Sequence, residues 1–194
     1  MSENDLIRLP EAIVFAGPNG SGKSTITRMA KIEGAYINAD DIKRTTLCTD
    51  LEAAVKAEEL REYMIENRKD FTFETVLSTD RNLRLLQKAK EHGYFVRGIY
   101  VLTFNADINV ARVNVREALG GHGVPEEKIR SRYDKAIALI PRLVAICDIL
   151  HIYDNTKEPF RISKKRKDRY YRWSNQYWSN DDIERLSGVT EYTN

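Results

Sequence analysis

The chain has 194 residues, 31 % of them charged, and a formal net charge of +2. This length suits one domain, and no apolar run approaches the length of a membrane-spanning helix. Because the N-terminus lacks the pattern of a secretory signal, we expect a cytoplasmic protein without a membrane partner. Cys48 and Cys147 stand far apart and outside any CxxC pattern. This argues against a disulfide framework or a zinc site and favours two reduced, buried thiols.

Apolar, β-rich runs alternate with helical patterns along the chain, which is typical of βαβ units and a parallel sheet. We expect strands at residues 12–17, 35–38, 71–76, 94–104 and 148–155. Helices are expected from Lys23 to Gly34, from a cap at Thr49 or Asp50 to about Lys69, from Ser78 or Thr79 to Gly93, over 106–119, and from Pro125 onward with a kink at Pro141.

Residues 158–194 differ in character from this pattern. In residues 161–194 eight Lys or Arg stand against five Asp or Glu, and aromatic residues flank the basic run 164–167. Basic residues interleaved with aromatics occur in nucleic-acid binders. A β-hairpin with a solvated charged tip, followed by a short helix at 180–186, is the simpler interpretation, and we prefer it. We therefore do not expect a nucleic-acid partner.

A glycine-rich segment follows the first expected strand and precedes a helix. It matches the pattern G-x-x-x-x-G-K-[ST] of phosphate-binding loops. Its residues are Gly17, Pro18, Asn19, Gly20, Ser21, Gly22, Lys23 and Ser24. Glycines let successive backbone N–H groups point at phosphate oxygens. We expect Lys23 to reach the β- and γ-phosphates of ATP and Ser24 to give its hydroxyl to Mg²⁺.

This loop predicts an α/β fold of the P-loop NTPase class, with three layers in the order α/β/α. We expect a five-stranded, mostly parallel sheet, a helical lid and a C-terminal β-hairpin. Residues 1–194 then form one P-loop domain, with a core at 11–157 and the hairpin and short helix at 158–194. The sequence of this loop also occurs in ABC-type ATPases. Such an ATPase needs an LSGGQ-like signature followed by a strand. The segment most similar to that signature, residues 185–190, has no strand after it, so we exclude that class.

Carboxylates stand at the ends of two expected strands, where open α/β sheets bind their ligands. Asp40 and Asp41 follow the second strand, and Glu74 ends the third. In phosphoryl transfer a carboxylate can orient an acceptor hydroxyl and take its proton, so Asp40 and Glu74 are candidates for the acceptor side. Asp40 or Asp41 could instead cap a helix. Glu74 could also bind the metal or its water shell.

Positive charge for the transition state is expected from arginines around the glycine-rich break 120–125. Two helices joined by such a break resemble a mobile lid that closes arginines over the γ-phosphate and excludes water. The candidates are Arg112 and Arg116 before the break and Arg130 and Arg132 after it. We expect no catalytic part for His122, which lies in the break.

Five segments follow one another from residue 16 to about residue 155: AGPNGSGKST, YINADDIKR, FTFETVLS, GGHGVPEEKIRSRY and YDN. In this order they resemble the zeta-toxin-like P-loop kinases, particularly the short branch described as zeta toxin family protein or predicted ABC-type ATPase. Zeta toxins phosphorylate a hydroxyl of UDP-N-acetylglucosamine using ATP and Mg²⁺, and a small antitoxin protein holds them inactive. The resemblance implies a nucleotide-sugar acceptor and an antitoxin partner.

The resemblance also implies roles for individual residues. The phosphate-binding loop extends to Thr25, Asp40 is the base for the acceptor hydroxyl, and Glu74 contacts the sugar. Well-studied zeta toxins have a glycine-threonine pattern after this glutamate, whereas this chain has the segment 75–78, with Thr75 and Ser78 as acceptor contacts. The charge-stabilising residues implied are Lys23, Arg116, Arg130 and Arg132.

Two other functions fit parts of the same pattern. A polynucleotide 5′-kinase has a base-bearing segment similar to residues 37–44, and the basic tail would then hold the strand. A regulatory module that hydrolyses ATP slowly would use Asp40 only as a cap, and no acceptor would raise its turnover.

Overall fold

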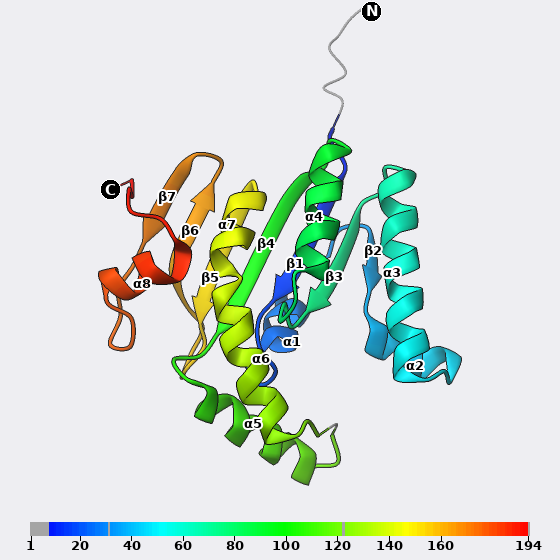
Figure 1. Ribbon diagram of the computed structural model, residues 1–194, viewed down its shortest axis with the longest axis horizontal. Coiled ribbons are helices and arrows are strands. Elements are labelled where there is room, and N and C mark those ends of the chain that lie inside the picture. Colours follow the sequence, from blue (N-terminus) through cyan, green and yellow to red (C-terminus); the bar gives the residue numbers. More distant parts are fainter. Residues whose placement is uncertain (1–7, 31, 122, 194) are drawn as a thin grey trace, which may run out of the picture.

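One mixed sheet forms the centre of the computed structural model, which describes residues 8–30, 32–121 and 123–193. The strand order is β2-β3-β1-β4-β5-β6-β7 (Figure 1). The strands are β1 Glu11–Ala16, β2 Ala35–Ile37, β3 Phe71–Thr75, β4 Phe95–Leu102, β5 Ile149–Asp154, β6 Phe160–Arg166 and β7 Arg169–Arg172. The helices are α1 Lys23–Met29, α2 Ala39–Thr46, α3 Asp50–Glu66, α4 Arg81–Glu91, α5 Ala106–Ala118, α6 Glu126–Ala138, α7 Ile140–Ile146 and α8 Asn180–Ser187.

The five expected parallel strands are confirmed, but the sheet has seven strands rather than five. The C-terminal hairpin continues the same sheet, because β6 pairs antiparallel with β5, and β7 pairs with β6. Thr49 caps α3, as expected, with a reciprocal hydrogen-bond pair to Glu52. The next helix begins at Arg81, after the expected start at Ser78 or Thr79.

The direction of the chain across the sheet decides which face each helix covers. From β1 the chain passes β3 to reach β2 at the edge, and afterwards it advances the other way through β3, β4 and β5. Since crossovers between parallel strands are right-handed, α1 lies on one face and α3, α4 and α7 lie on the other. Figure 1 shows this arrangement, with α3, α4 and α7 in front of the sheet. The reversal occurs at β1, so the end of β1 is the point where a ligand cleft is expected.

The hydrophobic core fills the space between the sheet and the helices of the second face. Phe71, Phe73, Leu86 and Tyr100 are fully buried there. A separate small cluster, Val110, Val113 and Ile129, holds α5 against α6. The expected lid therefore has its own apolar packing, which suits two helices that move together. His122, between these helices, lies outside the described residues.

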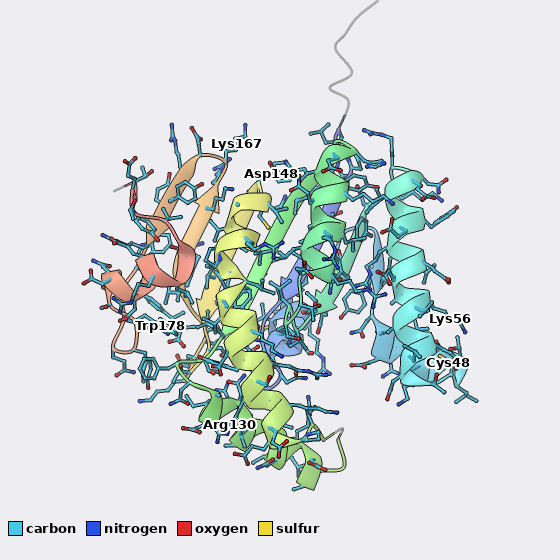
Figure 2. All side chains as sticks on the ribbon, in the orientation of Figure 1. Cys48, Lys56, Arg130, Asp148, Lys167 and Trp178 are labelled. Carbon is cyan, nitrogen blue, oxygen red and sulfur yellow. The ribbon has the colours of Figure 1, made fainter. Side chains whose placement is uncertain are left out.

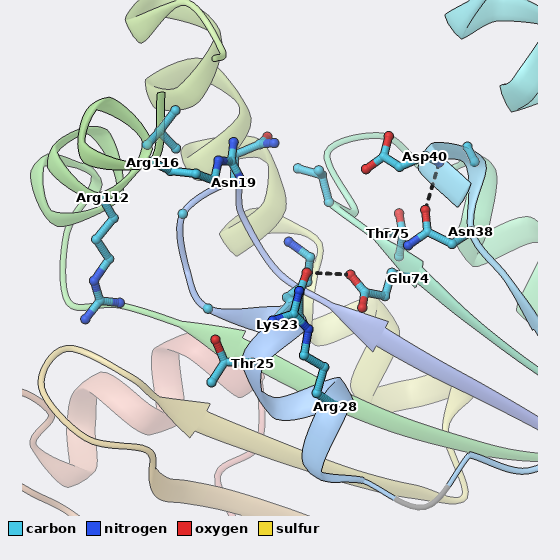
Figure 3. Close-up of a pocket in the computed structure, with 16 residues that line it drawn as sticks. Asn19, Lys23, Thr25, Arg28, Asn38, Asp40, Glu74, Thr75, Arg112 and Arg116 are labelled. Atoms are coloured by element: carbon cyan, nitrogen blue, oxygen red, sulfur yellow. Dashed lines mark hydrogen bonds between the residues drawn. The ribbon is translucent and has the colours of Figure 1, made fainter. Parts of the chain in front are cut away.

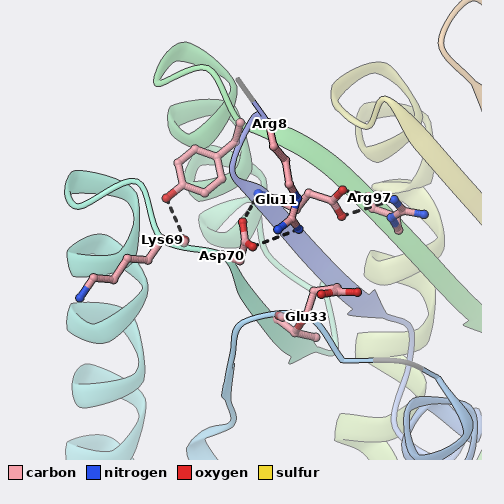
Figure 4. Close-up of polar contacts among 8 residues, drawn as sticks. Arg8, Glu11, Glu33, Lys69, Asp70 and Arg97 are labelled. Carbon is pink, nitrogen blue, oxygen red and sulfur yellow. Dashed lines mark hydrogen bonds and ion pairs between the residues drawn. The ribbon is translucent and has the colours of Figure 1, made fainter. Parts of the chain in front are cut away.

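Polar contacts fasten the opposite end of the sheet (Figure 4). The backbone N–H of Glu11 donates to Asp70 Oδ1 at 2.7 Å, and Arg8 forms an ion pair with the same carboxylate at 3.1 Å. Arg97 pairs with Glu11 at 3.3 Å. These contacts join the starts of β1, β3 and β4 and fix the strands that carry the site at their other ends.

Both cysteines are unbonded, as expected. Cys147 is buried, and burial raises the pKa of its thiol to about 12. Cys48 is only partly buried, so the expectation of two buried thiols is wrong for this residue. Within the described ranges, none of the helices combines the length and apolarity that a bilayer crossing requires.

Candidate active site

The loop between β1 and α1 turns tightly around three glycines. Gly17, Gly20 and Gly22 have φ values of 142°, 79° and 90°, which side chains rarely adopt. A Cβ on Gly17 would lie 2.0 Å from the carbonyl oxygen of Val101, and a Cβ on Gly20 would lie 2.5 Å from that of Asn109. The loop is therefore packed directly against the end of β4 and the start of α5.

Two asparagines hold the carbonyl groups of this loop. Asn109 is fully buried on α5, and its amide donates to the carbonyl of Asn19 at 2.6 Å. Asn155, directly after β5, donates to the carbonyl of Ser21 at 2.8 Å. Because both carbonyls accept these hydrogen bonds, the loop backbone has a fixed orientation. Sequence reasoning missed both roles, although Asn155 belongs to the segment YDN.

Lys23 begins α1 at the end of the loop. Its Nζ donates to the carbonyl oxygens of Gly17 at 2.6 Å and Pro18 at 3.0 Å. Burial lowers its pKa from 10.5 to about 8, and the charge of Arg116 acts in the same direction. Glu74 and Asp40 oppose this shift. Lys23 is thus an ammonium in a poorly solvated position, where an anionic ligand would gain most from it.

A chain of hydrogen bonds crosses from the loop to the end of β2. Ser24 Oγ donates to Glu74 Oε2 at 3.2 Å, and the phenol of Tyr36 donates to Glu74 Oε1 at 2.8 Å. Asn38 Nδ2 donates to the oxygen of Tyr36 at 3.2 Å. Burial and the hydrogen bond with Glu74 raise the pKa of Tyr36, so the phenol keeps its proton and remains a donor.

Asn38 caps α2, so the expectation of a cap at Asp40 or Asp41 is wrong. Asn38 Oδ1 accepts a hydrogen bond from the backbone N–H of Asp40 at 2.9 Å. Asn38 is the last residue before the helix and has an extended conformation, as a cap requires. The side chain of Asp40 is thereby released from capping, while Asp41 pairs with Arg44 at 2.7 Å.

These groups line one cleft with a volume of about 470 Å³ (Figure 3). Lys23, Ser24 and Thr25 come from the loop and α1, and Glu74 and Thr75 come from the end of β3. The remaining lining residues are Asn19, Gly20, Gly22, Arg28, Asn38, Ala39, Asp40, Val76, Arg112, Val113 and Arg116. The cleft therefore joins the carboxyl end of the sheet to one side of the lid.

The structure separates the expected arginines into two groups. Arg112 and Arg116 of α5 line the cleft with Lys23. Arg130 lies on the lid (Figure 2) and does not line the cleft. It pairs instead with Asp107 and Glu126. Arg132 lines a separate cleft between α6 and the loop after β3.

The two hydroxyl residues expected after Glu74 are also separated. Thr75 lines the first cleft, and its Oγ1 accepts hydrogen bonds from Asn82 Nδ2 at 2.8 Å and from the backbone of Leu77 at 3.0 Å. Ser78 lies with Arg132 in the second cleft. Arg28 of α1 lines the first cleft and was missed, because the sequence does not say which side of a short helix faces the sheet end.

A P-loop at the reversal point of a mostly parallel sheet, with a basic lid above it, defines a P-loop phosphotransferase. The family model for zeta toxin matches residues 3–169 of the chain. The chain therefore belongs to the zeta toxin family of P-loop kinases.

Comparisons with individual proteins find one relative in sequence and several in fold. An uncharacterized protein of Haemophilus influenzae is 30 % identical over 129 residues, which are 63 % of this chain and 92 % of that protein. A structure from the PezAT chromosomal toxin-antitoxin system of Streptococcus pneumoniae has 18 % identity, a TM-score of 0.57 and coverage of 79 % of this chain and 70 % of the other. A structure of AvrRxo1-ORF1:-ORF2 with ATP has 14 % identity, a TM-score of 0.70 and coverage of 95 % and 66 %. These likenesses show the fold.

Proposed function

We propose that the protein transfers the γ-phosphoryl group of ATP to a hydroxyl of a nucleotide sugar such as UDP-N-acetylglucosamine. The observation that carries this proposal is that Asp40 shares one cleft with Lys23 and Arg116. A carboxylate for the acceptor and cations for the phosphates are the groups that phosphoryl transfer needs from a protein. Family membership supports the reaction type, and the resemblance to zeta toxins supports the acceptor.

ATP fits the donor side of the cleft. Hydrogen bonds from Asn109 and Asn155 hold two carbonyls of the glycine-rich loop. Lys23 Nζ donates to the carbonyls of Gly17 and Pro18. In the complex, β- and γ-phosphate oxygens replace these carbonyls as hydrogen-bond acceptors of the ammonium. Their negative charge stabilises the charged lysine, which burial destabilises. Residues 17–25 bind the phosphates. Arg116 stabilises the charge that develops on the transferred group.

Mg²⁺ fits the oxygen atoms beside the loop. Ser24 Oγ and Glu74 Oε2 lie 3.2 Å apart, and hard oxygen ligands of this kind suit Mg²⁺. Ser24 would hold the ion directly, and Glu74 would hold it or its water shell. When bound, Mg²⁺ neutralises charge on the phosphate oxygens.

The acceptor side is formed by Asp40 and its neighbours. Asp40 accepts the proton of the acceptor hydroxyl while that oxygen attacks the γ-phosphorus, and the bond to the β–γ bridging oxygen breaks to release ADP. Glu74 and Thr75 contact the acceptor from the end of β3. Ser78 and Arg132 line the neighbouring cleft and contact a more distant part of a large acceptor. Arg130 takes part only after the lid has closed.

The cellular setting follows from the same family membership. We propose a cytoplasmic enzyme that acts as a toxin and is held inactive by a small antitoxin protein. The described structure from Streptococcus pneumoniae belongs to a toxin-antitoxin system, which supports this proposal by likeness of fold.

The test is ATP turnover with a panel of acceptors. UDP-sugars, nucleosides and oligonucleotides with a 5′-hydroxyl are each added to the wild type and to Asp40→Ala. A rate that depends on a UDP-sugar and is lost in the variant supports the proposal. Stimulation by oligonucleotides alone would identify a polynucleotide kinase instead. Slow turnover that no acceptor changes would identify a regulatory ATPase.

A further inference from the structure

Aromatic and basic side chains that do not line the kinase cleft gather on one side of the sheet. They are His151 and Tyr153 of β5, Arg161 and Lys164 of β6, and Tyr171 and Trp173 of the hairpin's second strand and its continuation. We call these six residues the open sheet face.

Strand pairing puts the six residues on the same side. His151 pairs with Lys164, which pairs with Tyr171, and Tyr153 pairs with Arg161. Neighbouring residues point the other way, since side chains alternate along a strand. Lys165, for example, donates to the carbonyl oxygens of Val144 and Ala145 on the α7 side. The open sheet face is therefore opposite α7.

The open sheet face has little helical cover. Right-handed crossovers put α1 on this side of the sheet, and α1 packs on β1. Among the described helices, α4 and α7 lie on the opposite side, and α8 packs against α7 (Figure 1). Strands β5 to β7 thus present one side to the surroundings, and Trp173 on it is 36 % exposed.

The rings and cations on this side are ordered. The rings of Tyr171 and Trp173 are nearly parallel, at 14°, with centroids 6.3 Å apart. The guanidinium carbon of Arg161 lies 4.6 Å from the centroid of Trp173, and Lys164 Nζ lies 5.6 Å from that of Tyr171. Each ring therefore has a cation beside it, as in grooves where bases stack and phosphates pass nearby.

The positive charge of this side is not compensated. Within the described part of the chain, Arg161 and Lys164 pair with no carboxylate, and Arg161 Nε has no acceptor. Neighbouring arginines are different, because Arg97 pairs with Glu11 and Arg172 pairs with Glu184. Burial and, to a smaller extent, the charges of Arg161, Lys164 and Arg97 lower the pKa of His151 to about 4.

The sequence alone favours a hairpin without a nucleic-acid partner, but the ordered rings and cations argue otherwise. We propose that the open sheet face binds single-stranded nucleic acid, with bases stacked on Tyr171 and Trp173 and phosphates at Arg161 and Lys164. A sheet that carries two or three aromatic rings is a general platform for unpaired bases. An acidic peptide would use the cations but has no need of paired parallel rings. A duplex keeps its bases inside, so the rings could not reach them. This site is separate from the kinase cleft and does not depend on the acceptor proposed above.

Fluorescence anisotropy tests this proposal. The probes are labelled 12-nucleotide single strands of RNA and of DNA, the corresponding duplexes, and an acidic peptide. We expect both single strands to bind more tightly than the duplexes and the peptide. Trp173→Ala should weaken binding about 5- to 100-fold, and Trp173→Phe should restore most of it. Arg161→Ala should reduce the slope of log affinity against log salt concentration by about 0.7.

Lys56→Ala is the matched control, since this exposed lysine lies on α3, far from the hairpin (Figure 2). It should change neither affinity nor salt slope. Thermal unfolding of each variant shows whether the sheet remains folded, and the affinity and salt slope of Arg161→Ala keep the test valid if Trp173→Ala does not fold. Absence of single-strand binding, or unchanged binding in the folded variants among Trp173→Ala and Arg161→Ala, would overturn the proposal. Preference for the acidic peptide would identify a protein partner instead and overturn it as well.

Discussion

The phenol of Tyr36 donates a 2.8 Å hydrogen bond to Oε1 of Glu74, and so joins β2 to the end of β3 beside it. The other carboxylate oxygen accepts from Ser24 of the phosphate-binding loop. Tyr36 also accepts a hydrogen bond from Asn38, which caps the helix that carries Asp40. The donor and acceptor sides of the cleft are therefore connected through one tyrosine.

Removal of this hydroxyl tests the connection. Tyr36→Phe should lower kcat/KM about 10- to 150-fold, because a net hydrogen bond to a charged group contributes about 1.5 to 3 kcal/mol. The fold should be retained, since Tyr36 is 37 % exposed. Steady-state kinetics at several Mg²⁺ concentrations measure the effect. Tyr63→Phe on α3 is the control, and equal losses in both variants would show that Tyr36 has no special role.

ATP affinity should depend on the protonation of Lys23. Burial lowers the pKa of this residue to about 8, and the anionic phosphates favour its charged form. Affinity should therefore weaken as the pH rises above about 8, by about tenfold per pH unit in the limit. Calorimetric titration of ATP across this range measures the effect. In Lys23→Met, affinity should be low and should lose this pH dependence, and a pH dependence identical to that of wild type would contradict the assignment.

The same shift has a consequence for folding stability. In the unfolded chain the lysine pKa is about 10.5, so between about 8 and 10.5 the unfolded state binds more protons than the folded state. Lys23 therefore makes the free energy of unfolding rise with pH across this window. Urea unfolding of wild type and Lys23→Met at several pH values measures the difference, which should diminish as the pH approaches 10.5. A difference that does not change with pH would argue against a shifted pKa.

Asn109 should be needed for both stability and loop geometry. Its amide donates to the carbonyl of Asn19, and its oxygen accepts from the hydroxyl of Thr103. Asn109→Ala leaves the carbonyl of Asn19 without this donor, whereas the Thr103 hydroxyl keeps the carbonyl oxygen of Asn105 as an acceptor, so the change should cost about 1 to 3 kcal/mol of the free energy of unfolding. ATP binding should weaken as well. Asn114→Ala, at an exposed position of the same helix, is the control. Equal stability of the two variants would contradict the role of Asn109.

The two lid arginines should differ in their effect on catalysis. Arg116 lines the cleft, whereas Arg130 pairs with Asp107 and Glu126. Arg116→Ala should lower kcat by about a thousandfold, as loss of a charge-stabilising arginine does in phosphoryl transfer. Arg130→Ala should have at least a tenfold smaller effect. A larger loss in Arg130→Ala than in Arg116→Ala would show that Arg130, and not Arg116, is the main charge-stabilising residue.

Local patterns predicted much of the fold and of the phosphate site. The motif from Gly17 to Ser24 is contiguous, and the strand and helix that flank it are adjacent to it in the sequence. The whole loop could therefore be predicted. The pairing of the hairpin with β5 could not be predicted in this way. Residues of β6 meet β5 with a register shift between Ile152 and Tyr153, and such long-range pairing leaves no periodic signal in the chain.

The rest of the site depends on how helices are oriented. Ile42 is one of the few apolar residues of α2, and the helix buries none of its side chains, so its pattern is weak and Asn38 was overlooked as its cap. Arg28 and Arg116 lie on helices whose orientation toward the cleft is set by packing against the sheet. Arg132 and Ser78 fall into a second cleft for the same reason.

Transfer of phosphate to a nucleotide sugar by the Asp40 cleft is most directly tested by phosphorus NMR of a reaction that contains ATP, Mg²⁺ and UDP-N-acetylglucosamine. Asp40→Asn keeps the shape of the side chain but removes the base, and Asp41→Asn is the matched control on the same helix. We predict a new phosphomonoester signal, formed together with ADP, for wild type and Asp41→Asn and not for Asp40→Asn. Formation of the phosphomonoester at the wild-type rate by Asp40→Asn, or release of inorganic phosphate alone by wild type, would contradict the account.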